Sequence, residues 1–454
     1  MSRSLFALGA AALGALAACD AAPQLSETDD FAPELSETDE ALTSVTQAIT
    51  DASSAAGGSV LEVTRELLGG DVYHYGFVVR VGDTANAKLH LHRVVRERTP
   101  WRPHATAGAA MLLHGDFGTF ATSFAPTLGT PPSTASGMAV YLAQRGLDIW
   151  GFDRRWTQAS AEGADLSDFG DMGMAAEIDD IGRALAFVRA VRVATGAGAD
   201  RLTLVGFSRG GQLAYAYTAQ EAGRPGWQRH VKALVPLDVY AELSPADDAL
   251  RQSACIRRDK ARADLDSGVV DAPNGFLIDT GARALTAPDD PSPTFPGMTN
   301  RGALFTVLGQ TYFFFQPVPV YHLAAPVLEG DVVTALRESP EDVTATWFAG
   351  ATPHQSLREV AEGDALWCGE APLPVAVALD RIRVPFFYLG AAGGFGDHGL
   401  YSTTRVGSTD VTTLVVRRFG ADREAEDFGH GDLLYAGDAP TLAWQPLASW
   451  ILQH

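Results

Sequence analysis

The stretch RLTLVGFSRGGQLAYA, residues 201–216, places one serine on a bend between two regular elements. Residues 202–205 form a short apolar run that is typical of a buried strand. Residues 211–222 are rich in alanine, glutamine and leucine, as expected for a helix. The sequence therefore predicts that Ser208 lies where a strand turns into a helix.

Small residues flank this serine on both sides, since Gly206 and Gly210 each lie two positions away. A sharp turn between strand and helix needs backbone conformations and close contacts that glycine tolerates best. Such a turn lifts the serine hydroxyl out of the sheet, where another molecule can reach it. The pattern G-x-S-x-G thus makes Ser208 the first candidate for a functional residue.

Length and charge limit the classes of protein. The chain has 454 residues, of which 46% are hydrophobic, so it can bury a large core. Acidic residues outnumber basic ones by 55 to 34, and the formal net charge is −21. Binding of nucleic acid needs a basic surface, so we expect no nucleic-acid partner.

The N-terminus has the features of an export signal. A basic residue, Arg3, precedes an apolar stretch that is too short to span a membrane stably. The stretch ends in Leu-Ala-Ala-Cys at residues 16–19, which resembles the lipobox of bacterial lipoproteins. The resemblance implies a signal peptide over residues 1–18 and lipidation of Cys19, the alternative being an ordinary secretory signal.

We expect residues 19–58 to form a flexible acidic tether, because they are polar and contain the repeat LSETD. An exported, lipid-anchored protein of the cell envelope follows, held to a membrane by the lipid alone. The remaining cysteines, Cys255 and Cys368, are predicted to form a disulfide, which persists in exported proteins. Two buried free thiols are the alternative.

Further along, strands alternate with helices, which predicts a mostly parallel sheet covered on both faces. Three antiparallel strands are expected to come first. The expected strands are residues 60–68, 72–81, 87–96, 109–115, 147–153, 201–206, 231–238, 382–390 and 410–419. The expected helices are residues 137–146, 174–193, the segment after Ser208, and a C-terminal helix.

Four landmarks in this order resemble the α/β-hydrolase family: LLHGDFG, WGFDRR, GFSRGG and FGHGDLL. The resemblance implies a mostly parallel eight-stranded sheet flanked by helices, formed by residues 59–238 and 382–454. Residues 239–381 would then be a cap or lid insertion between strands six and seven. Within it, the aromatic stretch 310–322 either forms the core of the cap or lines a substrate pocket.

The resemblance also implies a catalytic triad with Ser208 as nucleophile and His430 as base. For the acid that orients the histidine, Asp397 after the seventh strand is the first choice, and Asp238 at the end of the sixth is the alternative. Asp432 lies too close to His430 in sequence to be chosen.

An oxyanion needs two backbone N–H donors. The resemblance assigns them to Arg209, after the nucleophile, and to Asp116 in the HGDFG turn, with Phe117 as an alternative to Asp116. His114 is expected to brace this turn rather than to transfer protons.

No cofactor is implied, because the glycine-rich stretches fit neither a P-loop nor a dinucleotide fingerprint. His90 and His92 share one strand face, but no cluster of carboxylates or cysteines accompanies them, so we expect no metal site.

The resulting hypothesis is an exported serine hydrolase, a carboxylesterase or lipase, that cleaves small-molecule or lipid esters through an acyl-enzyme. A peptidase, a thioesterase or an acyltransferase could use the same triad. A binding protein at the cell surface that has lost turnover is the alternative of another class. The sequence leaves the oligomeric state open.

Overall fold

The computed structural model describes residues 58–128, 136–315, 320–370 and 377–454, together with positions 45, 47, 49–51 and 54. The expected signal peptide, Cys19 and most of the expected tether lie outside the described residues. The described residues all belong to the folded unit that begins after residue 41.

A ten-stranded sheet forms the centre of this unit, with the order β1-β2-β3-β6-β5-β7-β8-β11-β12 and β4 paired with β3. Pairing is antiparallel from β1 to β6 and parallel from β6 to β12. The sheet is thus mostly parallel, as predicted, and has ten strands instead of the eight that the resemblance implies. Nine of them match the nine expected segments, and β4 is additional. The strands are β1 (Ser59–Gly69), β2 (Val72–Arg80), β3 (Lys88–Thr99), β4 (Arg102–Pro103), β5 (Gly108–Leu113), β6 (Leu147–Asp153), β7 (Leu202–Phe207), β8 (Val231–Leu237), β11 (Phe386–Ala391) and β12 (Val411–Val416).

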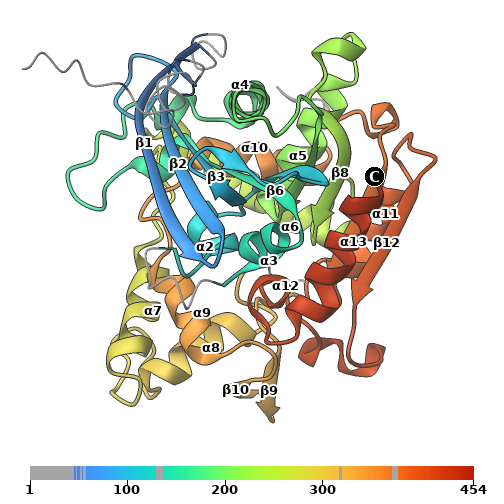
Figure 1. Ribbon diagram of the computed structural model, residues 1–454. Helices are drawn as coiled ribbons and strands as arrows, with labels where there is room; N and C mark the ends of the chain where they lie inside the picture. The colour runs from blue at the N-terminus through green and yellow to red at the C-terminus, as the bar shows by residue number, and fades with distance from the viewer. Residues whose placement is uncertain are drawn as a thin grey trace, which may run out of the picture. The chain divides into compact units, whose positions relative to one another are not determined.

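Helices cover both faces of the sheet, with α4 and α5 on one side and α3 and α13 on the other (Figure 1). Every residue of β6, β7 and β11 is buried, which explains why these strands read as continuous apolar runs. The helices outside the segment between β8 and β11 are α2 (Phe120–Phe124), α3 (Met138–Gln144), α4 (Met174–Ala194), α5 (Arg209–Glu221), α11 (Gly396–Thr403), α12 (Asp432–Tyr435) and α13 (Gln445–Gln453).

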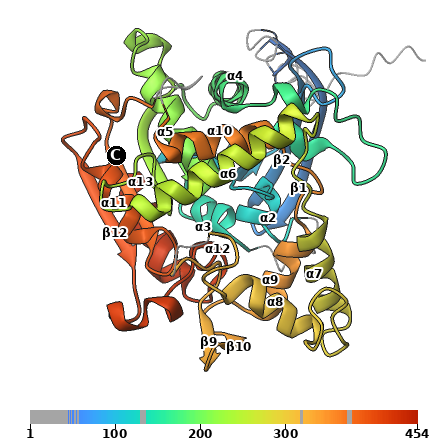
Figure 2. The same ribbon diagram turned by 180° about the vertical axis from the view of Figure 1, so that it is seen from behind.

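Residues 239–381, which we call the insertion, separate β8 from β11. The insertion forms two groups of elements rather than one layer. Helices α6 and α10 pack against each other and beside α4, whereas α7, α8 and α9 pack together elsewhere (Figure 2). Its elements are α6 (Asp248–Asp266), α7 (Gly275–Thr286), α8 (Asn300–Gly309), β9 (Pro326–Glu329), β10 (Val332–Leu336), α9 (Glu341–Ala349) and α10 (Leu357–Cys368).

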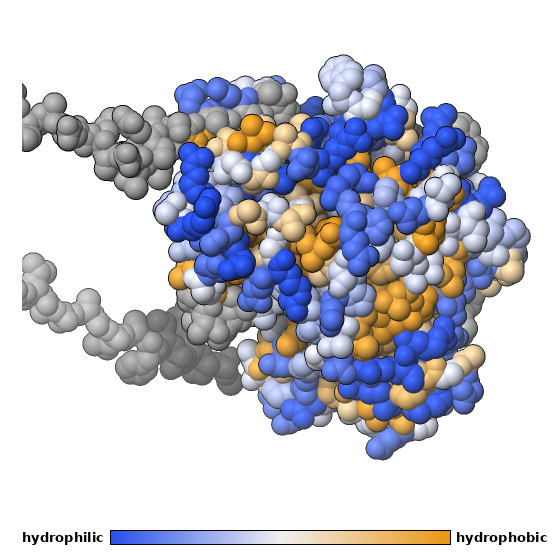
Figure 3. Space-filling model, turned by 45° about the vertical axis from the view of Figure 1, so that its right-hand side comes forward, coloured by the Kyte–Doolittle hydropathy of each residue, from blue (hydrophilic) through white to orange (hydrophobic). Residues whose placement is uncertain are grey.

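Hydrophilic side chains cover much of the face that Figure 3 shows, with smaller hydrophobic areas between them. Such a mixture is ordinary for the surface of a folded domain. In the part of the chain that the structure describes, no helix is both long and apolar enough to cross a bilayer.

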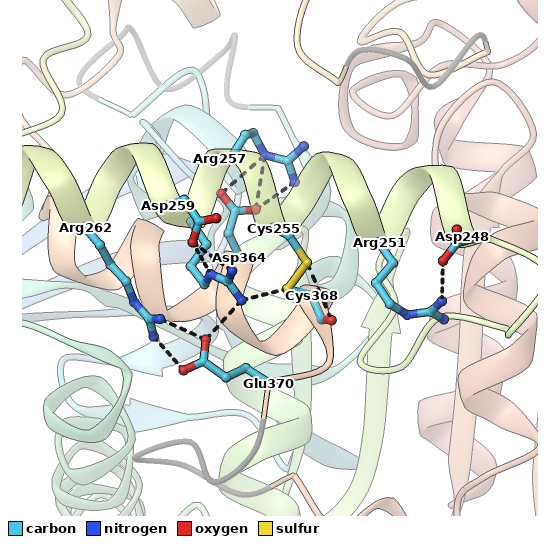
Figure 4. Close-up of a disulfide and its surroundings, with 10 residues drawn as sticks. Asp248, Arg251, Cys255, Arg257, Asp259, Arg262, Asp364, Cys368 and Glu370 are labelled. Atoms are coloured by element: carbon cyan, nitrogen blue, oxygen red, sulfur yellow. Dashed lines mark hydrogen bonds and ion pairs between the residues drawn. A yellow bond between two sulfur atoms is a disulfide. The ribbon is translucent and has the colours of Figure 1, made fainter.

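The predicted disulfide is confirmed: Cys255 in α6 is bonded to Cys368 at the end of α10, with their Cα atoms 4.8 Å apart. Ion pairs lie on both sides of it (Figure 4). Arg257 of α6 pairs with Asp364 of α10 at 2.7 Å, and Arg262 pairs with Glu370 at 2.9 Å. The covalent bond and the Arg257–Asp364 pair thus join the second half of α10 to α6, and the Arg262–Glu370 pair joins α6 to the residues that follow α10.

We expect the Cys255→Ser and Cys368→Ser double variant to lose up to about 4–5 kcal/mol of unfolding free energy, because the disulfide closes a long loop. Urea denaturation of oxidised and reduced protein measures this loss. Reduced wild type should match the variant, and the variant should not respond to reductant. Equal stability of oxidised wild type and variant would contradict the prediction.

Candidate active site

Ser208 lies on the predicted bend, between the end of β7 and the start of α5. Its backbone is strained, with φ 54° and ψ −125°. Neither flanking glycine has room for a side chain. A Cβ on Gly206 would lie 2.3 Å from the carbonyl oxygen of Gly210, and a Cβ on Gly210 would lie 2.3 Å from that of Leu113. The G-x-S-x-G pattern therefore reflects close packing of helix α5 against the strands.

His430 lies in the loop between β12 and α12, and its side chain is buried. Its main-chain N–H donates to the carbonyl of His322 in the insertion at 2.9 Å. Its imidazole stacks on the ring of Phe207, with ring centroids 4.4 Å apart. Phe207 directly precedes the serine, so this stacking places the imidazole beside the bend.

Asp432 anchors the histidine loop. One carboxylate oxygen accepts hydrogen bonds from the N–H of Gly429 at 2.7 Å and of Ala325 at 2.8 Å. The other accepts from the hydroxyl of Ser339 at 2.5 Å. Burial raises the pKa of Asp432 to about 7. Asp432 thus positions the loop that carries His430, without contacting its ring.

The acid that contacts His430 is Asp238, which follows β8. His430 Nδ1–H donates to Asp238 Oδ2 at 2.6 Å, so the other ring nitrogen, Nε2, is left to act as an acceptor. The carboxylate is fully buried and also accepts from the N–H of Ala391 at 2.9 Å and of Phe395 at 3.0 Å. The loop that donates these bonds passes so close that a Cβ on Gly394 would lie 2.0 Å from Oδ2.

The prediction that Asp397 orients His430 is therefore wrong, and the alternative, Asp238, has that position. Asp397 lies in the first turn of α11, its side chain is 52% exposed, and it pairs with Arg417 at 2.7 Å. The chain at the end of β11 and in the glycine-rich loop after it donates backbone N–H groups to Asp238. Asp397 follows this loop and pairs with Arg417, and it therefore does not serve the imidazole.

The two candidate oxyanion donors, Asp116 and Arg209, also contact each other through their side chains. Arg209 Nε lies 3.2 Å from Asp116 Oδ1, and Gln355 Nε2 donates to the same oxygen at 2.6 Å. Although burial opposes ionisation, the charge of Arg209 holds the pKa of Asp116 below its usual value. The negative charge of the Asp116 carboxylate is thus stabilised by Arg209 and Gln355.

The amide of Phe117, the alternative donor, is already engaged. It donates to Gln355 Oε1 at 3.2 Å. Of the two loop amides weighed from the sequence, Asp116 is therefore the better candidate. The loop also lies against the bend, because a Cβ on Gly115 would be 3.0 Å from the Cβ of Ser208.

Arg154 and His114 brace the start of this loop. Arg154 Nη2 donates to the carbonyl of His114 at 3.1 Å and to that of Gly115. Burial, reinforced by the charge of Arg154, lowers the pKa of His114 to about 3. A neutral, buried imidazole fits the predicted bracing role. Arg154 also forms an ion pair with Glu359 of α10.

Ser208 and His430 open into one cavity of about 310 Å³. Most of its wall is apolar and comes from the insertion. Of the aromatic stretch 310–322, four side chains line it, which supports the pocket interpretation over that of a core alone. The lining residues of the insertion are Pro273, Asn274, Phe276, Leu277, Phe313, Phe314, Phe315, Tyr321, Leu323 and Trp347.

One of the two histidines of β3, His92, belongs to a hydrogen-bonded chain. His92 lies 3.0 Å from His74 and 3.1 Å from Asp153, whose other oxygen accepts from the N–H of Phe120 at 2.5 Å. His90 lies on the same strand face as His92. Among the described residues, no group of three or more His, Cys, Asp or Glu side chains could hold a metal ion.

Two residues of the site carried no assigned role in the sequence. Arg154 lies within the landmark WGFDRR, so a role for it could have been sought there. Gln355 lies in the loop TPHQS of the insertion, and no pattern in the sequence marks it.

Comparison with solved structures supports the fold. A protein from Sulfolobus solfataricus that is assigned as a lipase is 17% identical, with a TM-score of 0.57, over 87% of this chain and 99% of that one. A soluble variant of the monoglyceride lipase of Saccharomyces cerevisiae, solved with a substrate analogue, is 12% identical, with a TM-score of 0.47, over 87% of this chain and 95% of that one. No protein-family model matches the chain, and no curated protein matches it significantly.

The first of these similarities, together with the strand order, identifies an α/β-hydrolase fold. The predicted fold class is therefore confirmed. A similarity at such low identity concerns the fold alone, so the function has to be argued from the site.

Proposed function

We propose that the protein is a serine hydrolase that cleaves carboxylic esters through an acyl-enzyme, with Ser208, His430 and Asp238 as its triad. One observation carries the proposal: a histidine held by buried Asp238 lines the same cavity as a serine on a strained bend. A serine hydroxyl is a weak nucleophile unless a base takes its proton, and this arrangement supplies one.

In the proposed reaction, Ser208 Oγ attacks the acyl carbon while His430 Nε2 takes its proton. Asp238 keeps the proton on Nδ1 and stabilises the imidazolium that forms. The N–H groups of Asp116 and Arg209 bind the oxyanion, and that of Arg209 is free of an intrahelical partner because Arg209 begins α5. His430 then protonates the leaving alcohol, and water attacks the acyl-enzyme by the same route.

The apolar lining of the cavity supports a substrate with an apolar acyl group, which would bind there. Its aromatic wall offers contact area to a hydrocarbon chain or ring, and burial of each methylene contributes about 0.8 kcal/mol. A peptidase, a thioesterase or an acyltransferase could use the same triad, and no contact in the cavity favours them. We therefore propose ester hydrolysis ahead of these other reactions.

Labelling with a fluorophosphonate probe tests the proposal. Wild type should become covalently labelled, and Ser208→Ala should not, because the probe reacts with an activated serine. Intact-protein mass spectrometry followed by peptide mapping locates the label. An unlabelled, folded wild type would contradict catalysis and favour a binding protein on this fold. Turnover of nitrophenyl esters of different chain length then measures the acyl preference.

A pair of variants tests which acid serves the histidine. We expect Asp238→Asn to lower kcat for a nitrophenyl ester by about 10⁴-fold, since it stabilises the wrong tautomer of His430. Asp397→Asn is the matched control and should stay within about twofold of wild type, because it removes only an exposed ion pair. The reverse ranking would restore the assignment of Asp397.

We also propose that the mature protein is exported and anchored to a membrane of the cell envelope through lipid on Cys19. The lipobox-like segment 16–19 supports this proposal. Mass spectrometry of the N-terminal peptide should find an acylated Cys19 as the first residue. Cys19→Ala should abolish both the modification and recovery of the protein in membranes, and an unmodified N-terminus downstream of Cys19 in wild type would contradict the anchor.

A further inference from the structure

We propose that Gln355, a residue of the insertion, positions the oxyanion loop 114–118, so that the insertion completes the catalytic site rather than only covering it. The inference rests on the proposed ester hydrolysis. Gln355 is a positioning residue in it, because it acts through Asp116 and Phe117 and not on the reacting atoms.

Gln355 holds the loop at two successive residues. Its Nε2 donates to Asp116 Oδ1 at 2.6 Å, and its Oε1 accepts from the N–H of Phe117 at 3.2 Å. Only one orientation of the amide satisfies both contacts, because the reverse would set oxygen against carboxylate and NH₂ against N–H. The side chain therefore fixes the carboxylate and the peptide that follow Gly115.

The loop needs such support, since its backbone is strained. Phe117 has a φ of 46°, a left-handed conformation that is unfavourable for a bulky residue. A second contact from the insertion lies on the other side of the same residue, where the N–H of Thr352 donates to the carbonyl of Phe117 at 2.9 Å. Residues 352–355 thus hold Phe117 by both its N–H and its carbonyl.

Gln355 is itself held firmly. Its side chain is buried, its N–H donates to Asp271 Oδ1 at 3.1 Å, and its carbonyl accepts from the N–H of Ala272 at 2.9 Å. The next residue, Ser356, caps helix α10 by accepting from the N–H of Glu359. The disulfide and the ion pairs described above join α10 to α6, so the clamp directly precedes a helix that is cross-linked to another helix of the insertion.

The expected consequence concerns charge at the reaction centre. The oxyanion forms beside Asp116, whose carboxylate would repel it if uncompensated. Arg209 and Gln355 both donate to that carboxylate. Without Gln355, the carboxylate loses one donor and the Phe117 amide loses its acceptor, so the loop can relax and move the Asp116 amide. Transition-state stabilisation falls, whereas the aromatic wall that binds the acyl group is unchanged.

We expect Gln355→Ala to lower kcat for a nitrophenyl ester by about 10- to 100-fold, with KM within about threefold of wild type. The matched control is Gln252→Ala in α6 of the same insertion, where the exposed side-chain amide donates to Asp248 Oδ2 at 2.7 Å. This control removes a glutamine side chain of the insertion without touching residues 114–118 or the residues that hold Gln355, and it should keep kcat within about twofold.

The pH profile of Gln355→Glu adds a readout that a purely structural role would not change. An ionised carboxylate at this position repels Asp116, whereas a protonated one can donate to it and still accept from Phe117. The deficit relative to wild type should therefore shrink as the pH falls. The deficit of Gln355→Ala should not depend on pH. Thermal unfolding of each variant checks that the protein is folded.

Wild-type kcat in Gln355→Ala would overturn the clamp while leaving the proposed function intact. A deficit in Gln355→Glu that is the same at every pH, or one that matches the loss of folded protein, would also overturn it. A folded wild type that neither reacts with the probe nor turns over esters would instead overturn the proposed function on which the clamp rests.

Discussion

The buried carboxylate of Asp238 is the constraint on which the site depends. A charge removed from water is very costly unless hydrogen bonds and an opposite or polarisable partner compensate it. Here two backbone amides and one imidazole N–H do so. These donors come from the end of β11, the loop that follows it and the loop after β12, so Asp238 connects segments that are distant in the sequence. Loss of any of these donors would leave the charge partly unsatisfied.

This constraint explains the glycines around Asp238 better than loop flexibility does. Gly394 has no room for a side chain, because the loop must come close enough for the N–H groups of residues 391 and 395 to reach the two carboxylate oxygens. The same principle holds at the serine, where Gly206 and Gly210 allow the backbone of α5 to approach two strands. In both places glycine is required by a close approach of one main chain to another group.

The sheet, its parallel part and the bend at Ser208 could be predicted from the sequence, because buried strands and a flanked serine leave local patterns. The disulfide could be predicted as well, since only two cysteines remain beyond Cys19. The acid that contacts His430 could not be decided in this way. Asp238 and Asp397 both follow strands at the same edge of the sheet, and only the path of the intervening loop shows which carboxylate meets His430. Gln355 was missed for a related reason: its role comes from a contact across 239 positions of the chain.

The insertion does more than cover the cavity, because its residues contact the proposed oxyanion loop directly. Three residues of the insertion reach the loop 114–118: Gln355 contacts residues 116 and 117, Thr352 donates to the carbonyl of residue 117, and Glu359 acts through Arg154 on the carbonyls of residues 114 and 115. Burial raises the pKa of Glu359, which means that placing its charge in the interior costs free energy. Apolar residues at the positions of the Arg154–Glu359 pair would not carry this cost. A buried ion pair fixes orientation more strictly than apolar packing, because its hydrogen bonds have defined directions. The α10 region thus gives up stability for a defined loop geometry, whereas α7, the aromatic stretch and Trp347 of α9 supply the apolar wall of the cavity.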